Sequence, residues 1–357
     1  MESSLRHIVV IQLGSLSNAA ICVHALRGLV RDFPEVRVTV VTHTAHLPLF
    51  RNLCGLEFVC ADEPKYRGLV GQLRLRRDIH RLRPGAIADL TATPLSRLLS
   101  STLTPWRCKV ARLRNPRLEG KELTRKYRKV MVQHQSLSSR SRDLFGSLGL
   151  PFCMPAPVRR TRAVELPAAV EILAGKKEGQ WVGVALLTPH HGTCYPIPLS
   201  AKLVDLLAER YDKLFLFGRG EYQRQFCEGM QMLHPNAISV AERLSLSEEM
   251  DMLSMLDAVV TVDCDILSLA SLVGTPAISI WGATHPFLES SGYGQDPKNS
   301  IQCTLPCRPC STSGRRKCLF GNYECMHSIT PEMVFSRVKS VTGRRTPSAP
   351  FVNKENY

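Results

Sequence analysis

A repeated alternation of buried strands and amphipathic helices constrains this chain more than any other feature. Residues 7–13 are β-branched and apolar, which is typical of a strand buried on both faces. A turn of small residues follows over 14–18, then helical spacing of apolar residues over 19–32, then a second β-branched segment over 36–41. Consecutive parallel strands need a crossover connection, usually a helix. The pattern therefore predicts an α/β fold built on parallel sheets.

A proline-rich segment divides this alternation into two halves. Residues 151–167 are rich in proline and arginine, and we interpret them as a domain linker. The alternation restarts at residue 181, and 357 residues are too many for one ordinary core. We therefore predict an N-terminal domain over 1–160, a second α/β domain over 161–342 and a disordered tail over 343–357. Ligands of such sheets bind at the carboxyl ends of the strands, so a cleft between the two domains is the expected site.

The net charge of the chain limits the classes of partner that it is expected to bind. The formal net charge is +15 and the isoelectric point is near 9.4, which favours nucleic acid, an anionic membrane face or phosphorylated small molecules. The sequence has no helix-turn-helix or RNA-binding signature, so we expect no nucleic acid partner. Its apolar runs are shorter than the roughly 20 residues that a spanning helix requires. We expect a cytoplasmic protein.

Several motifs, taken in their order along the chain, resemble one family. The most informative is residues 262–286, VDCDILSLASLVGTPAISIWGATHP. The others are residues 11–18 (IQLGSLSN), 25–27 (ALR), 89–90 (DL), 96–100 (SRLLS), 305–310 (LPCRPC), 323–326 (YECM) and 329–334 (ITPEMV). Together they resemble the ADP-heptose:lipopolysaccharide heptosyltransferases, the family 9 glycosyltransferases of Gram-negative bacteria, over about residues 7–341.

The resemblance implies a fold and a reaction. The expected fold is GT-B, with two Rossmann-like doubly wound domains that face a central cleft. The expected reaction is inverting transfer of a heptose or a related sugar. The donor would be an ADP-activated sugar and the acceptor the inner core of lipopolysaccharide or another envelope glycan. The resemblance implies no required cofactor or metal.

The position of the expected catalytic base differs from the family pattern. The family carries an Asp in the turn after the first strand, and this chain has Asn18 there. A carboxamide orients a hydroxyl but does not accept its proton, and general-base catalysis is typically worth about 10²–10⁴ in rate. Asp89, at the end of the predicted strand 86–90, is the alternative acceptor-facing carboxylate. Asn18 also fits a plain turn or helix-cap role.

The expected donor site differs in two further places. After the strand at 181–187 the family has a Lys, where this chain has Thr193, near Thr188. A hydroxyl supplies no charge-assisted contact to a phosphate. The motif His is Ser268, and Asp265 brings a negative charge to a helix N-terminus that would face the diphosphate. The full set of expected donor residues is Thr188, Thr193, Glu221, Leu244, Asp263, Cys264, Asp265 and Ser268, with Glu221 meeting the ribose.

A strongly basic segment is the expected acceptor side. Residues 107–129 carry ten Lys or Arg against two Glu. A lipopolysaccharide enzyme must bind a phosphorylated glycolipid at the inner membrane, and a basic segment would attract this anionic acceptor. We assign acceptor binding to Arg112, Arg114 and Lys121, and expect peripheral contact with the inner membrane. A solvated loop and helix face is the alternative.

Four cysteines have the spacing of a metal site. Cys307, Cys310, Cys318 and Cys325 form the pattern C-x2-C-x7-C-x6-C, which could close a tetrahedral zinc site. Free thiols or a local disulfide are the alternative. Any zinc here would be structural rather than catalytic.

The three departures leave two functions open. The first is an active glycosyltransferase with a rebuilt site. The second is a catalytically degenerate homologue that binds a glycan or a partner protein.

Overall fold

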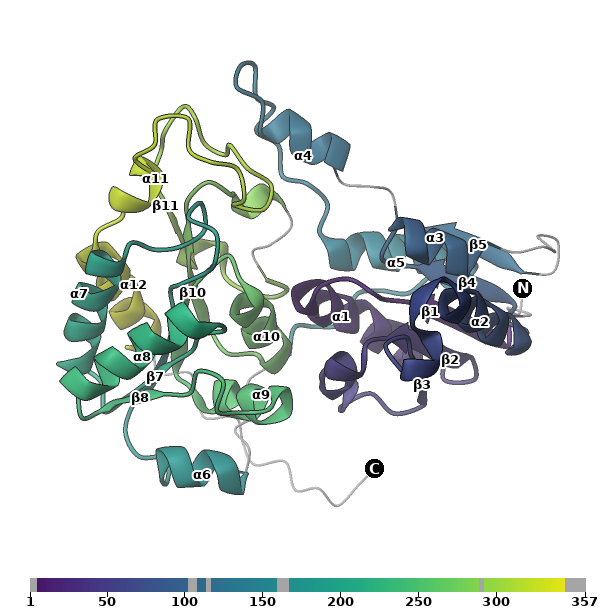
Figure 1. The fold of residues 1–357 in the computed structure, drawn as a ribbon, viewed down its shortest axis with the longest axis horizontal. Helices are drawn as coiled ribbons and strands as arrows, with labels where there is room; N and C mark the ends of the chain where they lie inside the picture. Colours follow the sequence, from purple (N-terminus) through teal and green to yellow (C-terminus); the bar gives the residue numbers. More distant parts are fainter. Residues whose placement is uncertain (1–4, 102–107, 114–116, 159–166, 289–291, 344–357) are drawn as a thin grey trace.

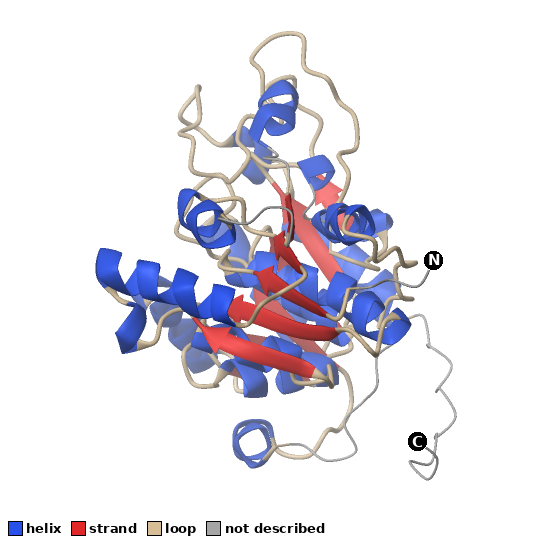
Figure 2. Cartoon of the chain, turned by 90° about the vertical axis from the view of Figure 1, so that its right-hand side faces the viewer, coloured by secondary structure: helices blue, strands red, loops and turns tan. Residues whose placement is uncertain are grey.

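The chain folds around two parallel β-sheets in a computed structural model. The model describes residues 5–101, 108–113, 117–158, 167–288 and 292–343. We call the half before residue 158 the N-lobe and the half after 167 the C-lobe; they lie side by side (Figure 1). Figure 2, viewed from the N-lobe side, shows the strands in the middle with helices on both sides. The expected parallel α/β architecture is confirmed.

The N-lobe sheet has the strand order β3-β2-β1-β4-β5. Every pair in it is parallel, and the central strand β1 is buried along its whole length because both faces are covered. The strands are β1 (His7–Ile11), β2 (Arg37–Thr42), β3 (Leu56–Cys60), β4 (Ala86–Asp89) and β5 (Lys109–Arg112).

The helices of the N-lobe begin earlier than the apolar spacing alone indicates. The first helix starts at Leu16 rather than near 19, because the Ser15 side chain accepts a hydrogen bond from the backbone N–H of Asn18 and caps it. The helices are α1 (Leu16–Asp32), α2 (Gly68–Arg81), α3 (Pro94–Ser100), α4 (Arg117–Leu123) and α5 (Leu137–Ser147), with short 3-10 turns η1 (Thr44–Phe50) and η2 (Pro64–Tyr66).

The C-lobe sheet has the order β11-β10-β9-β6-β7-β8, again with parallel pairs. The strands are β6 (Trp181–Ala185), β7 (Lys213–Leu216), β8 (Ala237–Ser239), β9 (Ala258–Val262), β10 (Ala277–Trp281) and β11 (Ser300–Gln302). The chain runs outward from β6 to β8 and then returns to β9 on the other side of β6. The point where the strand order reverses therefore lies between β6 and β9.

The C-lobe helices cover both faces of this sheet. They are α6 (Ala168–Ala174), α7 (Ile197–Ala208), α8 (Glu221–Leu233), α9 (Leu246–Met255), α10 (Asp265–Val273), α11 (Glu324–His327) and α12 (Pro331–Thr342), with η3 (Pro286–Leu288) and η4 (Pro297–Asn299). No helix in the described ranges is long and apolar enough to cross a membrane. The tail expected to be disordered lies outside the described residues from 344 onward.

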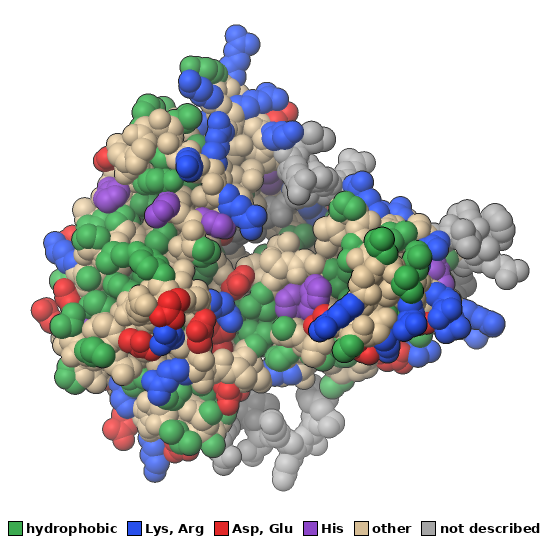
Figure 3. All heavy atoms as spheres, in the orientation of Figure 1, with side chains coloured by type: hydrophobic (Ala, Val, Ile, Leu, Met, Phe, Trp, Pro, Cys, Tyr) green, Lys and Arg blue, Asp and Glu red, His purple; other side chains and the backbone are tan. Residues whose placement is uncertain are grey.

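The two lobes meet where α1 packs against α10 (Figure 1). One apolar cluster of buried side chains runs through this contact, with Ala20 and Leu26 on α1 and Leu269 and Ala270 on α10 among its members. Polar contacts flank it: the Arg51 guanidinium, at the end of η1, bonds Asp251 on α9 at 2.5 Å. The surface is hollowed between the lobes above this contact (Figure 3).

A basic arm also crosses from the N-lobe to the C-lobe. It consists of α4 and the segment that follows it to residue 135. The Lys129 ammonium donates to the carbonyl oxygens of Cys307 and, at 2.8 Å, of Pro309. The backbone N–H of His134 donates to the carbonyl of Phe287 at 3.1 Å. The arm therefore spans the hollow beside the cysteine-containing loop.

Candidate functional site

The expected donor residues follow the carboxyl ends of β6, β7, β8 and β9. Because the strand order reverses between β6 and β9, their following loops flank the crevice in which sheets of this kind bind ligands. The loop after β6 contains Thr188 and Thr193, and the loop after β9 contains Asp263 and Cys264. The loop after β10 joins them, since the backbone N–H of Ala283 donates to the carbonyl of Gly192 at 2.8 Å.

The two threonines of the β6 loop hold the loop itself. Their hydroxyl oxygens are 2.9 Å apart, and each hydroxyl is 3.2 Å from the carbonyl oxygen of His190. Thr193 is buried beneath the loop that contains Gly314: a Cβ at that glycine would lie 2.6 Å from the Thr193 methyl group. The position expected to contact phosphate is thus used to shape the loop.

The β9 loop places acidic groups at the start of α10. Burial raises the pKa of Asp263 to about 6, and the charge of nearby Asp265 adds to the shift. Burial also raises the pKa of Cys264 to about 11, so its thiol stays protonated near neutral pH. A side-chain hydrogen bond from Thr284 to Asp263 offsets part of this upward shift in the pKa of Asp263, and Thr284 itself is buried. It is a polar group at the site that the sequence analysis missed.

Asp265 connects the donor side to the N-lobe. The Ser17 hydroxyl donates to its carboxylate at 2.5 Å. Asn18 follows directly in the first turn of α1, and it is exposed. The structure therefore brings the turn that contains the expected acceptor-facing residue against the start of α10. The backbone N–H of Asn18 donates to the Ser15 hydroxyl, so Ser15 rather than Asn18 is the residue that caps α1.

Asp89 does not occupy the acceptor-facing position expected for it. Its side chain is fully buried at the end of β4. One carboxylate oxygen accepts from the backbone N–H groups of Thr91 and Ala92, at 3.0 and 2.9 Å, and the other accepts from the Ser96 hydroxyl at 2.9 Å. These three donors fix the turn into α3, so the carboxylate is engaged inside the N-lobe rather than open to an acceptor.

The remaining donor residues lie in three different environments. Glu221 is exposed at the start of α8, where its hydrogen bond with Arg224 lowers the pKa of the carboxyl. Leu244 is half-buried and packs against the core between the lobes. Ser268 is buried one turn along α10 from Asp265.

The two expected acceptor residues that the structure describes, Arg112 and Lys121, lie on different elements. Arg112, at the end of β5, donates from its Nε to the Ser100 hydroxyl at 2.9 Å and so ties β5 to α3. Lys121 is exposed on α4, in the basic arm. Arg114 lies outside the described residues.

The four cysteines of the expected zinc site line one cavity of about 280 Å³, with Leu305, Phe320 and Tyr323 among its apolar neighbours. All four are free thiols. Within the described part of the chain, no three His, Cys, Asp or Glu side chains are arranged to hold a metal ion. The arrangement thus fits free thiols better than the zinc site that the spacing suggested, and we derive no step through a metal.

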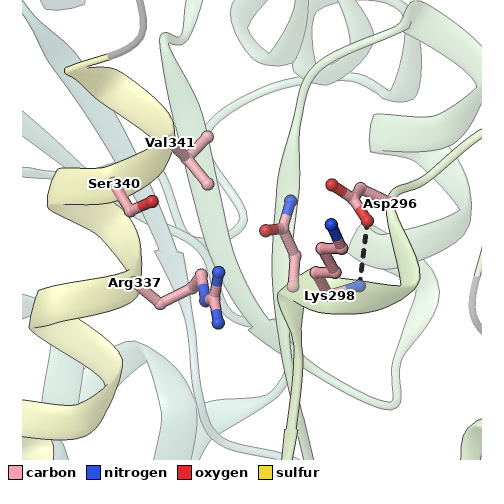
Figure 4. A pocket seen from close by; sticks show the side chains of 6 residues that line it. Asp296, Lys298, Arg337, Ser340 and Val341 are labelled. Atoms are coloured by element: carbon pink, nitrogen blue, oxygen red, sulfur yellow. Dashed lines mark hydrogen bonds between the residues drawn. The ribbon is translucent and has the colours of Figure 1, made fainter.

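A second cavity lies away from this site. It has a volume of about 170 Å³ and is bounded by Lys298 and Asp296 on one side and by Arg337 and Ser340 of α12 on the other (Figure 4). Since η4 directly precedes β11, this cavity is at the amino end of the strand. It therefore lies at the edge of the sheet opposite the candidate site.

Comparisons with known proteins agree with this architecture. Residues 170–323 match the family Glycosyltransferase family 9 (heptosyltransferase). No curated protein matches the chain.

Solved structures match nearly the whole chain. A family 9 glycosyl transferase from Veillonella parvula has a TM-score of 0.69 at 14% identity, covering 96% of this chain and 98% of its own. The E. coli heptosyltransferase WaaC with ADP has a TM-score of 0.64 at 16% identity, covering 94% and 99%. E. coli ADP-heptose lps heptosyltransferase II has a TM-score of 0.66 at 14% identity, covering 94% and 98%. The two parallel sheets thus form the expected GT-B arrangement of Rossmann-like halves.

Proposed function

We propose that the chain is a heptosyltransferase-like protein of glycosyltransferase family 9 that transfers a heptose or a related sugar. The family match over residues 170–323 and the fold support this proposal. The donor is an ADP-activated sugar, and the acceptor is the lipopolysaccharide inner core or another envelope glycan. One observation supports this most directly. The turn with Asn18 meets the start of α10 at the reversal point of the C-lobe sheet, through the contact of Ser17 with Asp265.

The chemistry of an inverting transfer makes two demands on this site. A group must take the proton of the acceptor hydroxyl as that oxygen attacks the anomeric carbon, and positive charge must stabilise the departing diphosphate. Asn18 is exposed on the acceptor side but orients a hydroxyl without accepting its proton. From the family resemblance we propose that the transfer needs no bound metal.

Calorimetry with ADP tests the donor assignment. We expect wild-type protein to bind ADP, and absence of heat at millimolar ADP would remove that assignment. The substitution Asn18→Asp supplies the missing base. We expect it to raise turnover of an ADP-sugar, by up to the roughly 10²- to 10⁴-fold that a general base contributes, with ADP binding unchanged. Asn18→Ala is the matched control, and it should give no gain.

The second candidate function is a degenerate homologue that binds a glycan or a partner protein. The observation that favours it is the negative charge of Asp265 at a helix start that would face diphosphate, together with half-buried Asp263. If the protein binds ADP and the Asn18→Asp variant still shows no turnover, the result would favour this binding function over the glycosyltransferase function.

For the acceptor side we propose contact with the cytoplasmic face of the inner membrane. The outer face of α2 supports it: Leu69 is 80% exposed, Val70 74% and Leu73 55%. Arg74 and Arg77 are exposed on the following turn of the same face. Apolar side chains flanked by arginines suit an anionic lipid surface. Figure 3 shows hydrophobic and basic side chains together over the right-hand lobe, where Figure 1 labels α2 and α3.

Vesicle flotation tests this contact. We expect the protein to float with phosphatidylglycerol vesicles and not with phosphatidylcholine vesicles. Leu69→Ser combined with Leu73→Ser should abolish flotation. Met232→Ser is the matched control, because Met232 is 86% exposed on α8 of the other lobe. Equal flotation of the α2 variant and the control would refute the assignment.

A further inference from the structure

In the β6 loop, neither of the residues expected to contact phosphate carries a positive charge. Thr188 and Thr193 are neutral, and their hydroxyls are engaged within the loop. A diphosphate bound at this edge would still need positive charge close by, because charge-assisted contacts are about twice as strong as neutral ones. That charge must then come from a side chain of a neighbouring loop.

The loop that follows Cys307 and Cys310 and contains Gly314 packs directly on the β6 loop. A Cβ at Gly192 would lie 2.6 Å from the carbonyl oxygen of Gly314, so both glycines allow the two backbones to approach closely. The base of this second loop is fixed as well, since the backbone N–H groups of Cys310 and Ser311 donate to the carbonyl of Ala283, at 3.0 and 3.1 Å. The residue after Gly314 is thereby held beside the β6 loop.

That residue is Arg315, and it contacts the β6 loop with its side chain. Its Nε donates to Nε2 of His190 at 3.1 Å. His190 therefore accepts through Nε2, which leaves its proton on Nδ1. A guanidinium has five N–H donors, and this contact uses one of them. Arg315 is exposed and forms no ion pair with a carboxylate among the residues that the structure describes.

Other cations near the site are already neutralised or engaged. Arg219, in the loop after β7, is paired with Glu249. The buried Arg308 guanidinium donates to the carbonyls of Gly282 and Thr284, among others. The Lys129 ammonium is held by two carbonyl oxygens of the cysteine loop. Arg315 differs from these three because, among the residues that the structure describes, its remaining donors have no protein acceptor at hydrogen-bond distance.

We propose that Arg315, oriented by His190, binds the terminal phosphate of the ADP moiety and supplies the positive charge that Thr193 does not. The proposal rests on the function proposed above and names a ligand-binding residue of that site. In the transfer, the bond between the anomeric carbon and the diphosphate oxygen breaks with its electron pair on that oxygen. A guanidinium beside the terminal phosphate stabilises this charge.

The test compares three variants by calorimetry with ADP and with AMP. Arg315→Gln should weaken ADP binding about 10- to 100-fold, the loss expected for a hydrogen bond to a charged group. AMP lacks the terminal phosphate, so its affinity should change far less. Arg315→Lys keeps the charge and should retain part of the ADP affinity. Arg316→Gln is the matched control, since Arg316 is exposed in the same loop and its guanidinium donates to the carbonyl of Cys310 in that loop rather than to the β6 loop.

The outcomes separate this inference from the function on which it rests. If wild-type protein binds no ADP at millimolar concentration, both are overturned. If wild-type protein binds ADP and the glutamine variants at 315 and 316 weaken it equally, the role of Arg315 is overturned and the donor site stands. A loss specific to Arg315→Gln and to ADP supports the inference. Thermal melting of each variant checks that this exposed position leaves the fold intact.

Discussion

Replacing Asp263 by Asn is expected to stabilise the protein at neutral pH. The carboxyl follows β9 in a desolvated position beside Asp265, and burial raises its pKa from 3.8 to about 6. A raised pKa means that the folded protein holds the proton more tightly than the unfolded chain does. The folded state is therefore favoured at low pH and loses stability as the pH rises from about 4 to about 6. Above that range the penalty is constant.

The size of this penalty follows from the shift. One pKa unit corresponds to about 1.4 kcal/mol, so a shift of about two units corresponds to up to about 3 kcal/mol. An Asn of nearly the same shape carries no charge and avoids the penalty. We expect Asp263→Asn to exceed the wild type by up to about 3 kcal/mol at pH 8, and to lose this advantage by about pH 4.

Urea unfolding between pH 4 and pH 8 measures this difference directly. Glu35→Gln, which neutralises an exposed carboxyl of the N-lobe, is the control and should leave the profile unchanged. An Asp263→Asn variant that is less stable than the wild type at pH 8, or that keeps the same pH profile, would refute the reasoning. A gain in stability would also indicate that the site retains a costly charge for a functional purpose.

Three further substitutions test other parts of the structure. Burial lowers the pKa of His24 from 6.5 to about 3, and neither ring nitrogen has a hydrogen-bond partner within the described chain. The wild type should thus lose about 3 kcal/mol between pH 6.5 and pH 4 relative to His24→Phe, as unfolding at both pH values would measure. Asp89→Ala leaves the backbone N–H groups of Thr91 and Ala92 unpaired and removes one partner of the Ser96 hydroxyl, and should cost about 3 kcal/mol in urea unfolding; an unchanged midpoint would contradict the turn-fixing role. Arg51→Ala removes a contact between the lobes and should cost about 0.5–1 kcal/mol, with a coupling to Asp251→Ala of similar size in a double-mutant cycle; no coupling would mean that the ion pair contributes nothing.

The parts of the fold that local patterns determine could be predicted from the sequence. The strands expected over 36–41 and 86–90 agree with β2 and β4 to within one residue at each end, because each is a short apolar segment with a clear turn on either side. The edge strands β5 and β11 could not be predicted in the same way. They are four and three residues long, and only pairing with a neighbouring strand makes them strands.

The site was predictable at the level of loops and less so at the level of side chains. The sequence correctly indicated that residues after β6 and β9 gather at one edge, since parallel strands end together. The engagement of Asp89 had a local signal in Thr91, Ala92 and Ser96, which are spaced for a turn and a helix cap. Arg315 had no such signal, because its contact with His190 joins residues 125 positions apart.

The apolar contact between α1 and α10 has a consequence for how the protein unfolds. Because one cluster of buried side chains continues from one lobe into the other, neither half buries its own hydrophobic surface completely. The two halves should therefore melt in a single calorimetric transition rather than as two independent units. Cutting the chain between residues 158 and 167 would leave each fragment with a bare apolar stripe, and fragments expressed separately should aggregate unless they are produced together.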